Sequence, residues 1–338
     1  MTSLNTAGPE PGTVSAAPPA RTARRTTTAV LVLATVLAGL LSPLQSTVNG
    51  ALGKNINDGN AAAVISFGSG LILMAVIVFA RPATRRQALN VPRLLRDGTI
   101  PWWNCVAGLC GAAVVLSEGI TVGTLGVAVF QIALISGLVI SGVVCDRVGA
   151  TSTIKQPVTP PRGLGALLAI VATAIAISPN FQVPGTIALA ILPFAAGLLA
   201  GWQPAGNSAV AQGSGSMLVS IGLNFLVGFV VLGIGLLVRA STGSVSFTLP
   251  GTWWMYTGGL LGLLSIAFMA LLVRGLGLLL LGLASIAGQL VGSLLLDVIS
   301  PSVGQPLHVV TVIGTVVALV AAGIGMIPSR SVPSVEAS

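Results

Sequence analysis

The sequence predicts an all-α integral membrane protein with ten transmembrane helices, arranged as two inverted repeats of five helices each. Hydrophobic residues make up 54% of its 338 residues and charged residues only 7%, whereas soluble domains carry about 25% charged residues. The apolar residues form continuous runs of about 20, the length that crosses a bilayer as a helix, and do not alternate as in an outer-membrane barrel. The two halves of the chain also share polar and aromatic residues at nearly constant separations.

Ten apolar runs, bounded by Gly, Pro and charged residues, give the expected spans. They cover residues 29–50, 61–80, 101–120, 122–145, 163–178, 186–207, 216–238, 252–273, 276–298 and 306–327. The loops between them are mostly short, which leaves no room for a catalytic domain outside the membrane. Residues 1–28 are poor in large apolar side chains, so we expect a disordered cytoplasmic tail there, and a short C-terminal tail at residues 328–338.

The basic residues predict the orientation of the chain. With ten spans, nearly all of the 15 Lys and Arg residues fall on the side of the N-terminal tail, and the other side keeps only Lys54 and Arg239. Cytoplasmic loops are enriched in Lys and Arg, so we expect a multi-pass protein of the inner or plasma membrane with both termini in the cytoplasm. The first run follows three arginines, as in a secretory signal peptide, but it lacks a clear A-x-A cleavage site, so we expect a retained helix.

A tandem duplication accounts for the similarity of the two halves. The pair Gln45 and Asn49 recurs 158 residues later as Gln203 and Asn207, and a Trp-Trp pair opens both the third and the eighth span. An odd number of spans per repeat forces the second copy into the membrane upside down. Many secondary transporters share this inverted plan, with the substrate site at the repeat interface. The two repeats cover residues 29–178 and 186–327.

Three motifs resemble those of a known family. Each repeat carries Q-x-x-x-N in its first helix and a paired Trp at the start of its third, and the fourth helix of the second repeat ends in GQLVGSLLLD. Together these motifs resemble the YdcZ-like branch of the drug/metabolite transporter superfamily, over residues 29–327 as two fused copies. The first copy departs from the pattern, because Leu138 stands where the second has Gln289. The resemblance implies a polytopic inner-membrane protein that transports small molecules, without identifying its cargo.

Amide side chains inside the expected spans are the candidate substrate site. Gln45 and Asn49 are four residues apart and therefore share one helix face, as do Gln203 and Asn207. Two such pairs would converge on one central site, where amides that both donate and accept suit a neutral or zwitterionic solute. The alternative is that they hydrogen-bond neighbouring helices. A proline beside each pair removes a backbone donor and favours an opened helix. Second-rank candidates, with the same alternative, are Gln131, Asn224 and Gln289.

Acidic residues are rare in the apolar runs. Glu118 is the only one well inside a run, which makes it a candidate for proton coupling. Its place late in its span leaves the alternative of a solvated glutamate near the outer end of the helix. Asp146 and Asp297 close the fourth helix of each repeat, where we expect a loop or capping role.

Enzymes need groups that this sequence lacks. A membrane enzyme requires a nucleophile with a base, a metal cluster or paired carboxylates, and the sequence offers one histidine, His308, and no acidic pair. The three cysteines lie in apolar runs with no CxxC spacing, as small buried residues do. Neither a nucleotide-binding GxxxxGK[ST] motif nor an aromatic–basic patch for nucleic acid occurs.

We therefore expect a secondary transporter of a small polar metabolite or drug-like molecule, working by alternating access at the repeat interface. It should need no cofactor and no metal, and it should not be an enzyme. Its expected partners are the lipid bilayer and the small-molecule substrate, not nucleic acid, and a homo-oligomer is possible. A channel or a non-transporting membrane partner protein is the alternative, although the rings of charge or filter-like loop of a channel are not visible.

Overall fold

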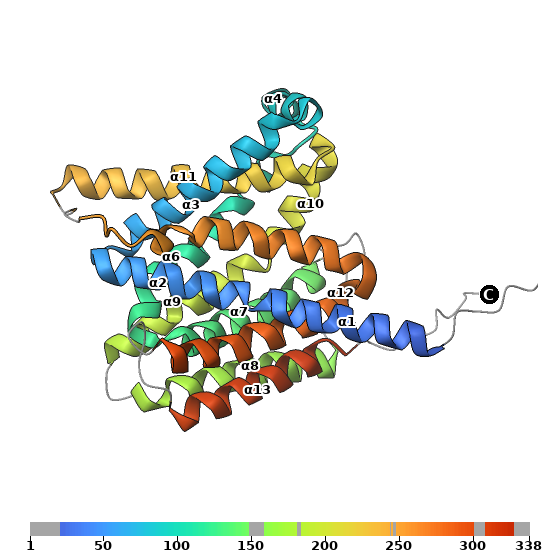
Figure 1. Cartoon of the computed structure of the whole chain (residues 1–338), viewed down its shortest axis with the longest axis vertical. Coiled ribbons are helices and arrows are strands. Elements are labelled where there is room, and N and C mark those ends of the chain that lie inside the picture. Colours follow the sequence, from blue (N-terminus) through green and yellow to red (C-terminus); the bar gives the residue numbers. More distant parts are fainter. Residues whose placement is uncertain are drawn as a thin grey trace, which may run out of the picture.

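The fold is a bundle of helices whose long axes run across the view in Figure 1. The structure is a computed structural model that describes residues 21–148, 159–180, 184–243, 245, 248–300 and 308–327. Within these residues it contains helices and no strand. The helices are α1 (Arg21–Gly39), α2 (Leu41–Ile56), α3 (Gly59–Ala80), α4 (Pro82–Arg96), α5 (Trp102–Cys105), α6 (Ala107–Leu125), α7 (Val127–Val148), α8 (Pro160–Ile177), α9 (Pro184–Ala200), α10 (Gln203–Ser214), α11 (Met217–Ser241), α12 (Gly258–Ile299) and α13 (Val309–Gly325).

The apolar helices match the expected spans in number when short ones are included. Eight of the described helical segments are long and apolar enough to cross a membrane, and two shorter apolar segments cover Gly258–Leu272 and Val309–Gly325. Helix α1 begins at Arg21, inside the segment that we expected to be disordered. Residues 1–20 and 328–338, where the remainder of the expected tails falls, lie outside the described residues.

Helix α12 contains most of one expected span, residues 252–273, and all of the next, residues 276–298, in one continuous helical segment. Its first half runs antiparallel to α1 and α2, whereas its second half runs parallel to them. The chain therefore reverses direction near Gly275, and α12 crosses the bundle twice (Figure 1). The contacts that show this, in order along α12, are Gly262 with Gln45, Gly275 with Leu31, Gly288 with Val36 and Gly292 with Pro43.

The first helix of each repeat is interrupted. Thr28–Ile56 and Gly185–Ser214 form apolar segments of 29 and 30 residues, longer than the stretch of about 20 that crosses a bilayer. The first breaks between α1 and α2, and the second between α9 and α10. Pro43 and Pro204 lie in the first turn after each break and cannot donate a backbone hydrogen bond. Both interruptions therefore lie beside a Q-x-x-x-N pair, as in the discontinuous helices of many transporters.

Equivalent helices of the two repeats pack against each other in opposite directions. Phe67 of α3 covers Gly228 of α11, and the equivalent Phe225 of α11 covers Gly70 of α3. The two rings lie 5.4 Å apart between centroids. The last helices, α8 and α13, also pack side by side (Figure 1). This reciprocal, antiparallel pairing shows that the repeats are inverted relative to each other about a pseudo-two-fold axis.

Helices of the two repeats also pack closely against each other at two pairs of glycines. Gly39 of α1 lies against Gly288 of α12, and the equivalent pair Gly197 of α9 and Gly137 of α7 makes the same contact. A Cβ atom at Gly39 would lie 2.6 Å from the carbonyl oxygen of Ser285, closer than packed atoms allow. The two repeats are therefore held together at these positions by backbone contacts that only glycine permits.

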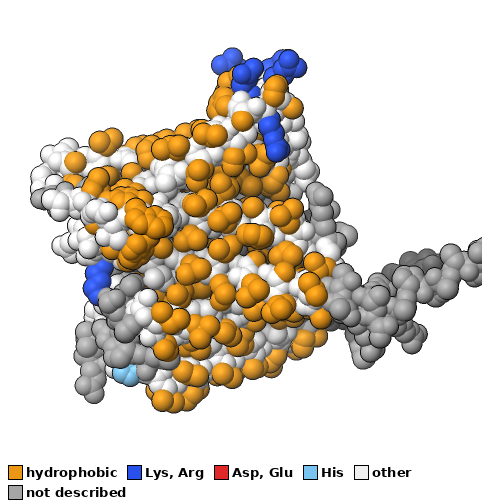
Figure 2. Space-filling view, viewed as in Figure 1, with side chains coloured by type: hydrophobic (Ala, Val, Ile, Leu, Met, Phe, Trp, Pro, Cys, Tyr) orange, Lys and Arg blue, Asp and Glu red, His pale blue; other side chains and the backbone are white. Residues whose placement is uncertain are grey.

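The face of the bundle seen in Figure 2 is largely apolar. Figure 2 shows hydrophobic side chains over most of the visible face and Lys and Arg side chains gathered where α4 lies. An apolar surface of this extent fits contact with lipid. The loop expected between the second and third spans folds instead as α4, an amphipathic helix with Val91 buried and Leu89 exposed among its arginines, as in helices that lie at a membrane surface.

Candidate functional site

A cavity of about 190 Å³ lies between the two repeats. Its walls come from both repeats, in residues that occupy equivalent positions, so the cavity lies on the pseudo-two-fold axis. The equivalent lining pairs are Gln45 and Gln203, Ser66 and Asn224, Phe67 and Phe225, Gly111 and Gly262, Val114 and Ser265, and Val115 and Ile266.

The two glutamines reach the cavity across the repeat interface. Gln45 of α2 lies over Gly262 of α12, where a Cβ atom would be 3.0 Å from its Nε2. Gln203 of α10 lies over Gly111 of α6 in the same way, at 3.1 Å. Glycine at both positions leaves room for the amide. Each interrupted helix therefore presents its glutamine against a helix of the other repeat, at the centre of the bundle.

The remaining lining is mixed in character and carries no charge. Besides the glutamines, the polar groups are Asn224 and the hydroxyls of Ser42, Ser66 and Ser265, and the paired phenylalanines form the largest apolar wall. Amides and hydroxyls both donate and accept hydrogen bonds. A solute with a polar part and a flat apolar part therefore matches these walls. Sequence reasoning missed the serines, since Ser is common in membrane helices and gives no distinct signal.

Asn49 does not line the cavity but belongs to a buried cluster around Glu118. Glu118 is 2% exposed, so the alternative of a solvated glutamate at the helix end is wrong. Its Oε1 accepts a hydrogen bond from Ser46 Oγ at 2.8 Å, and its Oε2 accepts one from Asn49 Nδ2 at 2.6 Å. Gln131 Nε2 donates to Ser46 Oγ at 3.0 Å and to Ser42 Oγ at 3.3 Å. Glu118 is buried because α2 packs beside α6 at this level, with Gln131 of α7 bonded to Ser46 of α2.

The other predicted amides contact protein groups. Asn224 Nδ2 donates to Asn207 Oδ1 at 2.6 Å, which places Asn207 behind the cavity wall. Gln289 Nε2 donates to Ser285 Oγ on its own helix at 3.0 Å. The structure thus brings Gln45, Gln203 and Asn224 to the cavity, holds Asn207 through Asn224, and leaves Gln289 outside the lining.

Asp297 joins the two repeats. The carboxylate of Asp297, at the end of α12, accepts hydrogen bonds of 2.8 Å from the backbone amides of Val127 and Ala128, at the start of α7. This confirms the expected capping role, although the capped helix belongs to the other repeat. The side chain of Asp146 lies outside the described residues. Within those residues, no three His, Cys, Asp or Glu side chains group as ligands for a metal ion.

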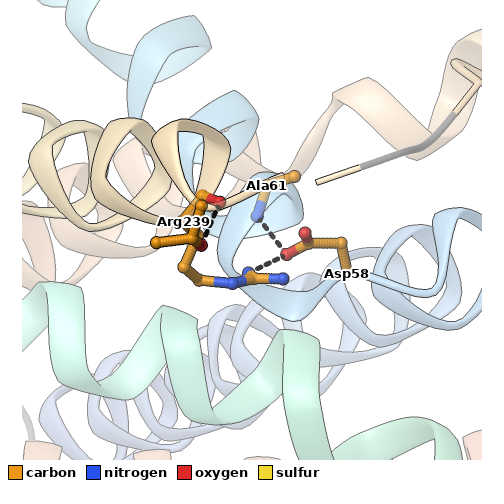
Figure 3. Close-up of polar contacts among 4 residues, drawn as sticks. Asp58, Ala61 and Arg239 are labelled. Carbon is orange, nitrogen blue, oxygen red and sulfur yellow. Dashed lines mark hydrogen bonds and ion pairs between the residues drawn. The ribbon is translucent and has the colours of Figure 1, made fainter. Parts of the chain in front are cut away.

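An ion pair that sequence reasoning missed joins the repeats at one end of the bundle. Arg239, near the end of α11, donates to Asp58 Oδ1 at 2.8 Å, and the same oxygen accepts a hydrogen bond from the Ala61 amide (Figure 3). Burial raises the pKa of the Asp58 carboxyl, but the hydrogen bonds from Arg239 and Ala61 outweigh burial and hold the pKa below its usual value. Asp58 therefore keeps its charge and caps α3 at the same time.

A family model described as "Putative inner membrane exporter, YdcZ" matches residues 30–175 and again residues 188–324. The chain belongs to this family. The two matches coincide with the two inverted repeats, so this protein contains two copies of the YdcZ unit in one chain. A comparison with curated proteins gives no match. The family and the apolar helices identify a multi-pass transporter of the inner membrane.

Proposed function

We propose that this YdcZ-family protein carries a compact, uncharged or zwitterionic solute by alternating access around the central cavity. The observation that supports this most is the lining of the cavity by equivalent residues of two inverted repeats. Two such halves can exchange conformations, so that the same site faces first one side of the membrane and then the other. Export is the direction that the description of the family names.

The size and chemistry of the cavity limit the solute. A cavity of about 150 Å³ holds a benzene ring, so the 190 Å³ present here admits a molecule only slightly larger. The glutamines and serines provide donors and acceptors, and Phe67 and Phe225 provide an apolar face. We infer a small metabolite or drug-like molecule with a polar end and a flat apolar part, and a net charge of zero.

Untargeted metabolite analysis tests the function without knowing the cargo. Cells that express the protein should release at least one small solute that cells expressing a Gln45→Leu, Gln203→Leu double variant retain. The expected solute has no net charge and roughly the size of the cavity. If the two strains release identical solutes and differ only in ion leakage, the protein is a channel and the proposal fails.

Orientation follows from the basic residues. We propose that the end with α4 faces the cytoplasm, because its arginines match the positive-inside rule. The Asp58–Arg239 ion pair then closes the outer end. The equivalents of Asp58 and Arg239 in the other repeat are Ser216 and Arg81. Ser216 caps α11 through the Val219 amide as Asp58 caps α3, but it offers Arg81 no carboxylate. Only the outer end therefore carries this ion pair.

Loss of the ion pair should open the outer end more often. We expect Arg239→Gln to raise the rate at which an external, impermeant maleimide labels a cysteine placed at Ser265, by up to about fivefold, since a partly exposed pair contributes at most about 1 kcal/mol. The matched control is Arg81→Gln at the equivalent position, which should leave this rate unchanged. Equal rates in both variants would show that the pair does not restrict access. Because the pKa of Asp58 is lowered, the pair persists in mild acid and is lost only as pH falls through that pKa.

A further inference from the structure

Glu118 is buried with neutral partners only. It is 2% exposed, and within the described residues it forms hydrogen bonds with Ser46 and Asn49 but no ion pair. A buried carboxylate without a compensating positive charge is costly, and such a group usually takes up a proton or binds a cation. The equivalent residue in the second repeat is Met269, so Glu118 is not required by the repeat architecture.

The charged groups on the helices packed around α6 do not reach Glu118. On α2, Lys54 is exposed and its side-chain carbons lie against Gly123. On α11, Arg239 pairs with Asp58 at the N-terminus of α3. On α7, Arg147 is exposed at the far end. Helices α3, α5, α9 and α10 carry no Asp, Glu, Lys, Arg or His within their described bounds.

Two buried amide oxygens beside Glu118 have no partner. Asn49 is 1% exposed and Gln131 is 0% exposed, yet Asn49 Oδ1 and Gln131 Oε1 accept no hydrogen bond within the described structure. Unpaired acceptors at such depth are rare and costly. Each belongs to an amide whose nitrogen already contacts the Glu118 cluster. A half-turn of either amide would therefore exchange a donor for an acceptor at the same place.

A chain of hydrogen bonds connects Glu118 to the cavity. Ser46 Oγ donates to Glu118, and Gln131 Nε2 donates to both Ser46 Oγ and Ser42 Oγ. Ser42 lines the cavity. A change in the protonation state of Glu118 can therefore change the hydrogen bonds of Ser46, Gln131 and Ser42 in turn. The last of these, the Ser42 hydroxyl, is a group that a bound solute would touch.

We propose that Glu118 is the proton-binding site of the transporter, with Asn49 and Gln131 as positioning residues that reverse their hydrogen bonds when the proton binds. One proton adds to the carboxylate and gives a neutral carboxylic acid, whose new O–H donates to Asn49 Oδ1 after a half-turn of that amide. The oxygen Oε1 of the neutral acid is a weaker acceptor than that of the carboxylate, so the Ser46 hydroxyl turns from Glu118 to Gln131 Oε1 once that amide has turned likewise. The same Gln131 Oε1 accepts from Ser42, which then presents an acceptor to the cavity. The role of Glu118 in energy coupling rests on the proposed transport function, but proton binding at Glu118 can be tested without it.

A proton fits this cluster better than a sodium ion. Both oxygens of Glu118 already accept hydrogen bonds of 2.6–2.8 Å, and the nitrogens of the two amides, not their oxygens, face the carboxylate and the serines. A hard cation needs several oxygen ligands directed at one point. The cluster presents donors there, as an acid–base site does.

Labelling with dicyclohexylcarbodiimide, which adds to protonated carboxyl groups, tests the site without a cargo. In purified full-length protein, mass spectrometry should find the Glu118 peptide labelled in mild acid, with labelling that declines as pH rises. Exchange of K⁺ for Na⁺ at constant pH should not change it. Protection by Na⁺ would identify a sodium site instead, and no labelling at any pH between about 5 and 9 would show a permanent charge; either result overturns the proposal.

A matched pair of variants tests the role of Asn49. Asn49→Leu removes a charge-assisted hydrogen bond to the carboxylate, which is stronger than the bond that the turned amide makes to the neutral acid. The protonated form is therefore favoured, and Glu118 should be labelled up to roughly tenfold faster at a given pH. Asn207→Leu changes the equivalent residue, which contacts Asn224 and not a carboxylate, and should leave labelling unchanged. Equal effects of both variants would show general loosening and would overturn the positioning role. Glu118→Gln should lose the label while its elution on size exclusion stays normal.

The failure of this inference can be distinguished from failure of the proposed function. Once a cargo is known, Glu118→Gln should abolish accumulation against a gradient and spare downhill exchange. If labelling of Glu118 depends on pH but metabolite analysis finds no transported solute, only the transport proposal is refuted. Unchanged gradient-driven transport in Glu118→Gln would refute proton binding as the coupling step while the transporter stands.

Discussion

Gly288→Ala should destabilise the protein strongly, although it adds one methyl group. The new Cβ would overlap the Val36 carbonyl oxygen and lie 3.1 Å from Gly39 Cα, and neither backbone group can move without separating α1 from α12. Overpacking of this kind costs about 2 kcal/mol or more, which corresponds to a loss of about 4–8 °C in Tm. Thermal unfolding followed by size-exclusion chromatography of detergent-solubilised protein measures it.

The matched control is Gly233→Ala. Gly233 lies within α11, and a Cβ atom there would have open space around it. Alanine favours helix over glycine by up to about 1 kcal/mol, so this variant should be neutral or slightly more stable. The same chemical change should therefore act in opposite directions at the two sites. If both variants melt at the wild-type temperature, the packing at this pair of glycines is looser than the structure shows.

Removal of one cavity amide should nearly abolish transport. We expect Gln45→Leu or Gln203→Leu to lower export of the solute found by metabolite analysis by ten- to a hundredfold, because a lost hydrogen bond in a buried site costs about 1–3 kcal/mol. The two variants should have similar effects, since their side chains occupy equivalent positions on the pseudo-two-fold axis. Initial rates of solute efflux, normalised to folded protein, provide the measurement.

Gln289→Leu is the control for this pair. Gln289 is also an intramembrane amide, but it contacts Ser285 on its own helix and does not line the cavity. Export should stay within about twofold of the wild-type rate, the level of a modest packing change. Should the cavity variants fail to fold while their folded remainder exports normally, these glutamines serve helix packing and not the solute.

The periodicity of apolar runs and the internal duplication predicted most of the fold. Span lengths are fixed by bilayer thickness, and a five-span repeat has to be inverted, so the packing of α3 against α11 follows. Arg274 and Gly275 marked the reversal within α12 in the sequence, but nothing there indicated that helical geometry continues through it. The helix α4 was not predicted, because an arginine-rich segment between two spans is equally typical of a loop.

The candidate site was predicted in part. The repeat identified Gln45 and Gln203, because equivalent polar residues on interrupted helices converge at a two-fold axis. The burial of Glu118 could not follow from its distance along one helix, since it depends on α2, which packs beside α6 and donates hydrogen bonds to the carboxylate. The Asp58–Arg239 pair links residues from the two repeats, and single-chain patterns give no sign of such a partner.

The cap on α7 affects how the protein is made. Val127 and Ala128 receive their hydrogen-bond partner, Asp297, from a position 169–170 residues later in the chain. During synthesis the ribosome has therefore delivered α7 to the membrane long before its cap exists. Until Asp297 arrives, these amides are satisfied only by water, lipid headgroups or an insertion chaperone. Biogenesis of the first repeat thus ends only when the ninth expected span enters the bilayer, and a stalled or truncated chain exposes an uncapped helix end to the cell's membrane proteases.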